Sequence, residues 1–199
     1  MSLIRSISQS PNLRISESCT TCNLGFSASE EYLACLLECI KHGTTTPNET
    51  FRPKIAATLK ARPALSARIE AAKYTSNSGA TLWRPEDDRV REVVLKLARG
   101  HLSYELGIQR TDAPLTLQVT PLLLMSDEER QSFFDIESAA IYPEIGSRSF
   151  INCLSGKPTA YENWLVVQEL TYAYAVGQGD GNWVKILIRE YLACHVTWD

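Results

Sequence analysis

The residues best suited to chemistry are two cysteines near the start of the sequence, Cys19 and Cys22. A C-x2-C spacing lets one tight turn aim both sulfurs at a single Zn2+ ion. Asn23 and Gly25 suit the turn conformations that such a knuckle requires. Because structural zinc is almost always bound by four ligands, this pair provides half of a site. We therefore predict that Cys19 and Cys22 are ligands of a structural zinc ion.

Two further cysteines, Cys35 and Cys39, are candidates for the missing ligands. They are one helical turn apart and therefore share a face of a helix. The complete spacing, C-x2-C-x12-C-x3-C, resembles that of a classical zinc finger in which both histidines are replaced by cysteine. However, no strand-like run precedes Cys19, and the surrounding helix is longer and more apolar than that of a finger. The alternative is that both thiols pack as small hydrophobic groups in the core.

The C-x2-C pair is also the first of a longer series of recognisable sequence segments. C-T-T-C-N is followed by E-E-Y-L-A-C-L-L-E-C, H-G-T-T-T-P, R-P-K-I, R-V-R-E-V-V-L-K-L-A-R-G-H, P-E-I-G-S-R and E-Y-L-A-C. Along nearly the whole chain this series resembles the rear part of a bacterial group of zinc-knuckle HNH endonucleases. In that family a front C-x2-C precedes a Glu-His pair, and a later C-x2-C-N closes the zinc site. The resemblance implies a DNA-directed protein in which Cys19 and Cys22 bind zinc.

The sequence departs from that family in its catalytic part. Residues 1–18 contain no His and no C-x2-C, so the front zinc pair and the histidine that activates the nucleophile are both missing. Without an imidazole to activate water and a cation to stabilise the leaving oxygen, phosphodiester hydrolysis has no evident catalyst. We therefore interpret the chain as a truncated, wrongly started or degenerate relative with unknown catalytic residues. The alternative is a non-catalytic bacterial protein-interaction module that binds no metal.

Other polar residues give weaker signals. His101 lies on the apolar stripe of a predicted helix, one turn before Glu105, and there we favour a hydrogen-bonded core histidine over a ligand or catalyst. Arg148, between two serines, has the chemistry to bind an anion, although such a segment more commonly fixes loop geometry. The glycine-rich run 177–181 has no Lys-Ser/Thr and leads into a predicted strand, so we reject it as a phosphate-binding loop.

Composition is that of an ordinary soluble globular protein. The 199 residues are 44% hydrophobic and 22% charged, and the net charge is −3. An acidic chain is an unusual nucleic-acid binder, although Arg89, Lys96 and Arg99 share a polar stripe that either contacts phosphates or is simply solvated. No apolar run is long enough to span a bilayer, and no export signal is visible. We therefore expect a cytoplasmic protein with reduced thiols and no membrane partner.

Local signals predict where the helices near the knuckle begin and end. A cap at Ser27 or Ser29 begins the first helix, and Gly43 ends it. Pro53 and Pro63 each suit the first turn of a further helix, because proline has no backbone N–H to lose there. The knuckle is therefore expected to precede a small helical unit.

The predicted body combines one long helix with a sheet. The helix covers 86–106, and a strand follows within 114–124. Ser126 and Glu129 form a capping box that begins a short helix. Four β-rich runs between 163 and 198 predict an antiparallel meander. An exposed final strand would favour pairing with a second chain, so we name a homodimer, a partner protein and DNA as candidate partners.

These elements define the predicted organisation. Residues 1–18 form a mobile or extended arm, 19–75 form a zinc-knuckle-like turn with a helical unit, and 76–199 form an α+β body. We expect the last two segments to form one compact domain. The fold class is α+β, in which an N-terminal helical unit is followed by a long helix packed on a C-terminal antiparallel β-meander.

Overall fold

The computed structural model describes residues 20–76, 79, 81–136, 143–155 and 164–199. The arm predicted for residues 1–18 lies outside these ranges. The chain divides into two compact units, with the division between Val93 and Val94. The division falls inside the helix Asp87–Leu106.

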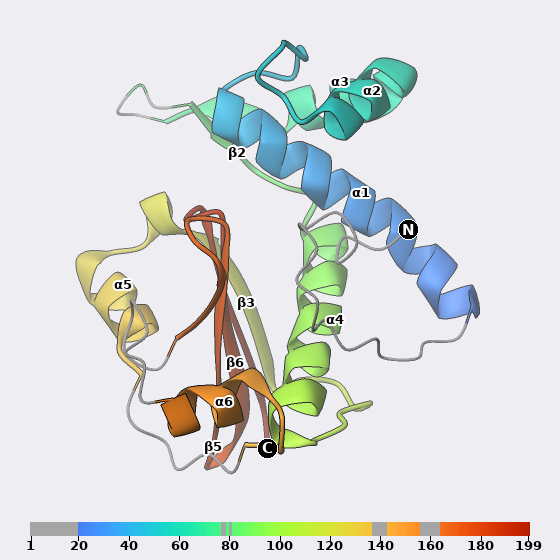
Figure 1. The fold of residues 1–199 in the computed structure, drawn as a ribbon. Helices are drawn as coiled ribbons and strands as arrows, with labels where there is room; N and C mark the ends of the chain where they lie inside the picture. Colours follow the sequence, from blue (N-terminus) through green and yellow to red (C-terminus); the bar gives the residue numbers. More distant parts are fainter. Residues whose placement is uncertain (1–19, 77–78, 80, 137–142, 156–163) are drawn as a thin grey trace. The chain divides into compact units, whose positions relative to one another are not determined.

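The first unit is mainly helical. Its elements are α1 (Thr20–His42), α2 (Pro53–Ala61), α3 (Pro63–Ala71), β1 (Lys73–Thr75), β2 (Thr81–Trp83) and the first turns of α4 (Asp87–Leu106) (Figure 1). The prediction that Pro53 and Pro63 each begin a helix is confirmed. Gly43 follows the end of α1 with a φ of +68°, a left-handed conformation that glycine adopts without steric cost.

The predicted cap of the first helix is wrong, because α1 begins at Thr20 instead of after Ser27 or Ser29. Ser29 is buried inside α1, and its hydroxyl donates to Glu92 Oε2 of α4 at 2.5 Å. The serine therefore connects two helices, and it does not cap a helix N-terminus. Asn23 and Gly25, which we placed in a turn, lie within the helix.

The second unit is a five-stranded antiparallel sheet with helices. Its strands are β3 (Thr116–Pro121), β4 (Leu165–Gln168), β5 (Tyr172–Gly179), β6 (Gly181–Ile188) and β7 (Leu192–Trp198), in the spatial order β3-β7-β6-β5-β4. The short helices are η2 (Leu122–Leu124), α5 (Asp127–Phe134) and α6 (Arg148–Ser155). The predicted α+β class, with a helical front and a C-terminal antiparallel meander, is confirmed.

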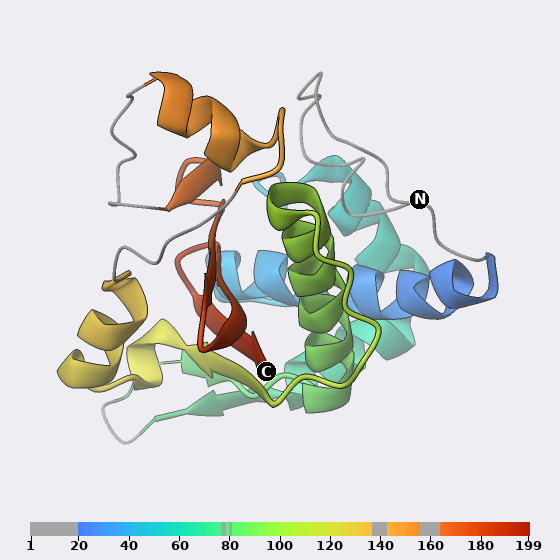
Figure 2. The same cartoon turned by 90° about the horizontal axis from the view of Figure 1, so that it is seen from below.

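The two faces of the sheet are covered by different helices. Figures 1 and 2 show α5 on one face and the second half of α4 on the other. Phe133 of α5 packs with Trp164 and with Ala173 and Leu187 of the sheet. On the α4 face, His101 contacts β5 through Tyr172 and Tyr174. The capping box of Ser126 and Glu129 is present at the start of α5, as predicted.

The final strand is not exposed, which corrects one expectation. β7 lies between β6 and β3, and the hydroxyls of Thr116 and Thr197 are 2.7 Å apart across the β3–β7 pair. The outer strands of the sheet are β3 and β4. Pairing of two chains through the last strand therefore has no basis, and a homodimer stays a prediction without this support.

Candidate functional site

The predicted zinc ligands lie at the beginning of α1. Cys19 is outside the described residues, and Cys22 is in the first turn of the helix, where only its backbone is described. The partial positive charge of a helix N-terminus favours thiolate, the form of cysteine that binds metal. The assignment of Cys19 and Cys22 as zinc ligands stays a prediction.

Cys35 and Cys39 have the properties of core residues. Both are fully buried on one face of α1. Burial raises the pKa of each thiol to about 12, so both are neutral at physiological pH. Among the side chains that the structure describes, no three from His, Cys, Asp and Glu come together as a metal site. The burial of both thiols and their raised pKa values favour core packing for Cys35 and Cys39.

A largely buried polar cluster joins α4 to the sheet in the second unit. The Nε2 atom of His101 lies 2.6 Å from the hydroxyl of Tyr172. The His101 ring also stacks on Tyr174, with 3.6 Å between the ring centroids. Tyr172 and Tyr174 can both reach this histidine because alternate residues of β5 share one face of the sheet. The expectation of a hydrogen-bonded histidine at position 101 is confirmed.

Glu105 completes this cluster and was missed from the sequence. Its carboxylate is fully buried and accepts hydrogen bonds from the hydroxyl of Tyr174 and, at 2.8 Å, from the backbone N–H of Ser149. Ser149 lies in the first turn of α6, so a carboxylate from α4 caps that helix. The available signal was the spacing of four residues from His101, which places Glu105 on the same buried stripe.

Arg148 was assigned to a loop, but α6 begins at this residue. Ser147 precedes the helix, and its Oγ accepts a hydrogen bond from the backbone N–H of Phe150 at 3.1 Å. The N-terminus of α6 thus already receives a serine hydroxyl and the Glu105 carboxylate. An external anion would have to compete with these internal acceptors.

The electrostatics of the cluster favour neutral rings. Burial, with a smaller effect from the nearby charge of Arg148, lowers the pKa of His101 to about 3. Burial raises the pKa values of Tyr172 and Tyr174, and for Tyr174 the Glu105 carboxylate adds to the effect. A general acid or base works best with a pKa near the working pH. The cluster therefore connects α4, β5 and α6 structurally and is poorly suited to proton transfer.

A second buried carboxylate, Glu38, organises the first unit. It is fully buried on α1 and accepts hydrogen bonds from the backbone N–H and the Nε of Arg52, at 2.9 and 2.7 Å. His42 lies one turn further on, with Nε2 3.5 Å from Glu38, and its ring stacks on Phe51. These contacts hold the loop between α1 and α2 against the C-terminal end of α1.

Comparisons with known proteins give no relative for this chain: no protein-family model, no curated protein and no solved structure matches it. The HNH resemblance therefore depends on the C-T-T-C-N sequence and the segments that follow it. Within the described ranges, no helix combines the length and apolar character needed to cross a membrane.

Proposed function

We propose that this chain is the rear part of a zinc-knuckle HNH-type protein that associates with DNA. In this proposal Cys19 and Cys22 provide two of the four ligands of a structural zinc ion. The observation that carries the proposal is that a long helix, α1, includes Cys22 and continues to His42, directly behind the C-x2-C-N sequence. The resemblance implies an amphipathic helix behind C-T-T-C-N, and α1 is the helix at this place in the sequence.

The histidines of the chain support a protein that does not cleave DNA alone. His42 is the histidine of the first unit, and it lies twenty residues beyond Cys22 on the same helix. At 1.5 Å per residue this separation is roughly 30 Å, so His42 lies far from the end of α1 that carries Cys22. His101 and His195 have pKa values lowered mainly by burial, so both are weak bases. The activating histidine and the front zinc pair would therefore come from outside these 199 residues.

Metal analysis of the purified chain tests the proposal. We expect at most one zinc per chain, lost in Cys22→Ser because a two-ligand knuckle cannot lose one thiolate and keep the ion. Cys153→Ser is the matched control, since Cys153 is an exposed free thiol on α6. The measurement is the zinc-to-protein ratio by mass spectrometry after gel filtration. Zinc that persists in Cys22→Ser, or that is lost equally in the control, would refute the assignment.

A metal-free interaction module is the second candidate. It is favoured by apolar side chains that are exposed on and beside α6: Ile145, Ile151 and Leu154 are 75%, 51% and 73% exposed. Exposed apolar groups that gather on one element commonly mark a binding surface. A wild-type chain that contains no zinc would favour this candidate. The DNA upstream of Met1 also discriminates, because an in-frame C-x2-C and Glu-His there would favour the nuclease relationship.

A further inference from the structure

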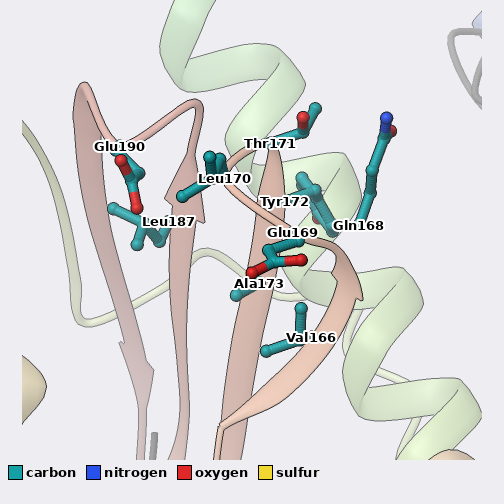
Figure 3. Close-up of a pocket in the computed structure, with 9 residues that line it drawn as sticks. All are labelled: Val166, Gln168, Glu169, Leu170, Thr171, Tyr172, Ala173, Leu187 and Glu190. Carbon is teal, nitrogen blue, oxygen red and sulfur yellow. The ribbon is translucent and has the colours of Figure 1, made fainter. Parts of the chain in front are cut away.

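A pocket in the second unit lies at one end of the sheet, beside two tight turns. The turn between β4 and β5 and the turn between β6 and β7 both border it (Figure 3). Its volume is about 80 Å³. Val166, Ala173 and Leu187 form an apolar floor, and the carboxylates of Glu169 and Glu190 come from the two turns.

The walls of this pocket are held in place by the backbone. The N–H of Arg189 in one turn donates to the carbonyl of Thr171 in the other at 2.7 Å. Leu170, Arg189 and Glu190 have φ values of 56°, 53° and 49°, a left-handed region that residues other than glycine seldom adopt. Because both turns are fixed in this way, Glu169 and Glu190 extend from defined positions.

The pocket combines an apolar interior with negative charge. Tyr172 also lines the pocket, and its hydroxyl is hydrogen bonded to His101. Among the described residues, no Lys, Arg or His lines the pocket, and no ion pair involves Glu169 or Glu190. From residue 94 to residue 199 the sequence has 8 basic and 13 acidic residues, a net charge of −5. Both the local and the regional charge therefore attract cations.

We propose that this pocket binds a primary ammonium group on a short aliphatic stem, the chemistry shared by a lysine side chain and a free alkylamine. The stem would lie on Val166, Ala173 and Leu187, and the ammonium would lie between Glu169 and Glu190. The volume of about 80 Å³ is roughly five times the minimum that one water requires. Four carbons and a nitrogen therefore match the available space. The site is independent of the zinc knuckle and of the proposed DNA association.

The first test is a titration of the full chain, labelled with 15N, with 1-aminobutane, followed by amide chemical shifts. We expect saturable shifts confined to residues 168–173 and 187–191. The neutral isostere 1-butanol is the control and should bind on the order of tenfold more weakly, because it lacks the charge that the two carboxylates attract. Amine shifts that do not saturate, or that occur equally with the alcohol, would refute the site.

The second test removes one charge at a time. Glu169→Gln and Glu190→Gln should each weaken 1-aminobutane binding roughly fivefold, the upper range for an exposed ion pair. Asp180→Asn removes the same charge from the exposed turn between β5 and β6, at the other end of these strands, and should leave binding within about twofold. Equal weakening in all three variants would mean that only the general charge attracts amines, and the pocket assignment would be wrong.

A third titration identifies the source of the ammonium. Nα-acetyl-lysine methylamide has the same stem and head group but also carries a peptide backbone. Binding at least as tight as that of 1-aminobutane would assign the pocket to a lysine of a partner protein. Binding of the amine alone would assign it to a small free amine. Failure of both compounds would overturn the proposal.

Discussion

His101 and Glu105 lie one turn apart on α4, and they differ in what they require from their surroundings. The histidine is stacked on Tyr174 and bonded to Tyr172, and burial keeps its ring neutral. The glutamate accepts two hydrogen bonds, from the Tyr174 hydroxyl and the Ser149 N–H. Two polar residues on a buried stripe are tolerated because each has a partner.

The lowered pKa of His101 predicts a specific pH dependence of stability. Its folded value is about 3, compared with about 6.5 in an unfolded chain. As pH falls, the unfolded state therefore binds the proton first, and stability that is present above about pH 6.5 is lost on the way towards pH 3. Between pH 7 and pH 5 this loss is about 2 kcal/mol.

We expect His101→Gln to remove this loss, because glutamine does not titrate and can still hydrogen bond to Tyr172. The measurement is urea unfolding of both proteins at pH 7 and pH 5. Wild type should lose about 2 kcal/mol more than the variant between the two values. The carboxylates titrate in both proteins and therefore cancel. If the free energy of unfolding falls equally in wild type and in His101→Gln, the lowered pKa of His101 would be refuted.

For single residues, sequence reasoning succeeded where the pattern implied that a hydrogen-bond partner is needed. A histidine on an apolar helical stripe needs a hydrogen bond, so the nature of the His101 site was predictable although Tyr172 was not. Glu105 and Glu38 were missed because their partners, Ser149 and Arg52, lie 44 and 14 residues away. Burial of a carboxylate depends on such distant donors, which local spacing does not reveal.

The helix α5 begins with a complete capping box. The Ser126 Oγ accepts from the N–H of Glu129 at 3.1 Å, and Glu129 Oε2 accepts from the N–H of Ser126 at 2.8 Å. Phe133 of this helix is buried in a core cluster with Trp164. Loss of the cap should therefore affect packing on this face of the sheet as well as the helix itself.

We expect Ser126→Ala to lower the free energy of unfolding by about 1 kcal/mol, because a backbone N–H loses its acceptor. The control is Ser132→Ala, an exposed serine inside the same helix. Alanine favours helices, so this change should be neutral or stabilising by about 0.5 kcal/mol. Chemical denaturation of both variants provides the comparison. Equal effects would mean that the capping box contributes nothing measurable.

The predictability of an element depended on where its end signals lie. The prolines that begin α2 and α3 and the capping box of α5 are local signals, and these helices were predicted correctly. The N-terminus of α6 receives the Glu105 carboxylate from another helix, and α6 was missed. For α1, Ser29 was taken as a cap, yet its hydroxyl bonds Glu92. The acceptor at the N-terminus of α6 and the role of Ser29 in α1 are both set by tertiary contacts, which local sequence signals do not reveal.

The whole molecule consists of two compact units that share α4. Each unit has its own fully buried residues, such as Ile69 of α3 in the first and Ile186 of β6 in the second. Contact-dense regions of this kind commonly open as separate cooperative units. The order of helices and strands, and hence the α+β class, was predictable from periodicity. The position of the division between the two units, inside α4, was not predictable, because the apolar stripe of this helix continues across it.

A crossed pair of variants tests whether the two units open separately. Ile69→Ala should reduce amide protection in α1, α2 and α3 by about 2–5 kcal/mol and leave β6 and β7 unchanged, because the cavity destabilises only its own unit. Ile186→Ala should have the reverse effect. Native-state hydrogen exchange measures both sets of amides in one experiment. If protection falls together in both units in either variant, the chain unfolds as one cooperative body.

The position of β3 has a consequence for how the protein is made. β3 pairs with β7, and Thr116 meets Thr197, 81 residues later in the chain. The β5–β6 and β6–β7 hairpins join neighbours in sequence and can form quickly. During synthesis β3 emerges long before its partner, with its backbone hydrogen-bonding groups unmatched. Its alignment against β7 is therefore a late step, and until then β3 is the strand most open to capture by a chaperone or by another nascent chain.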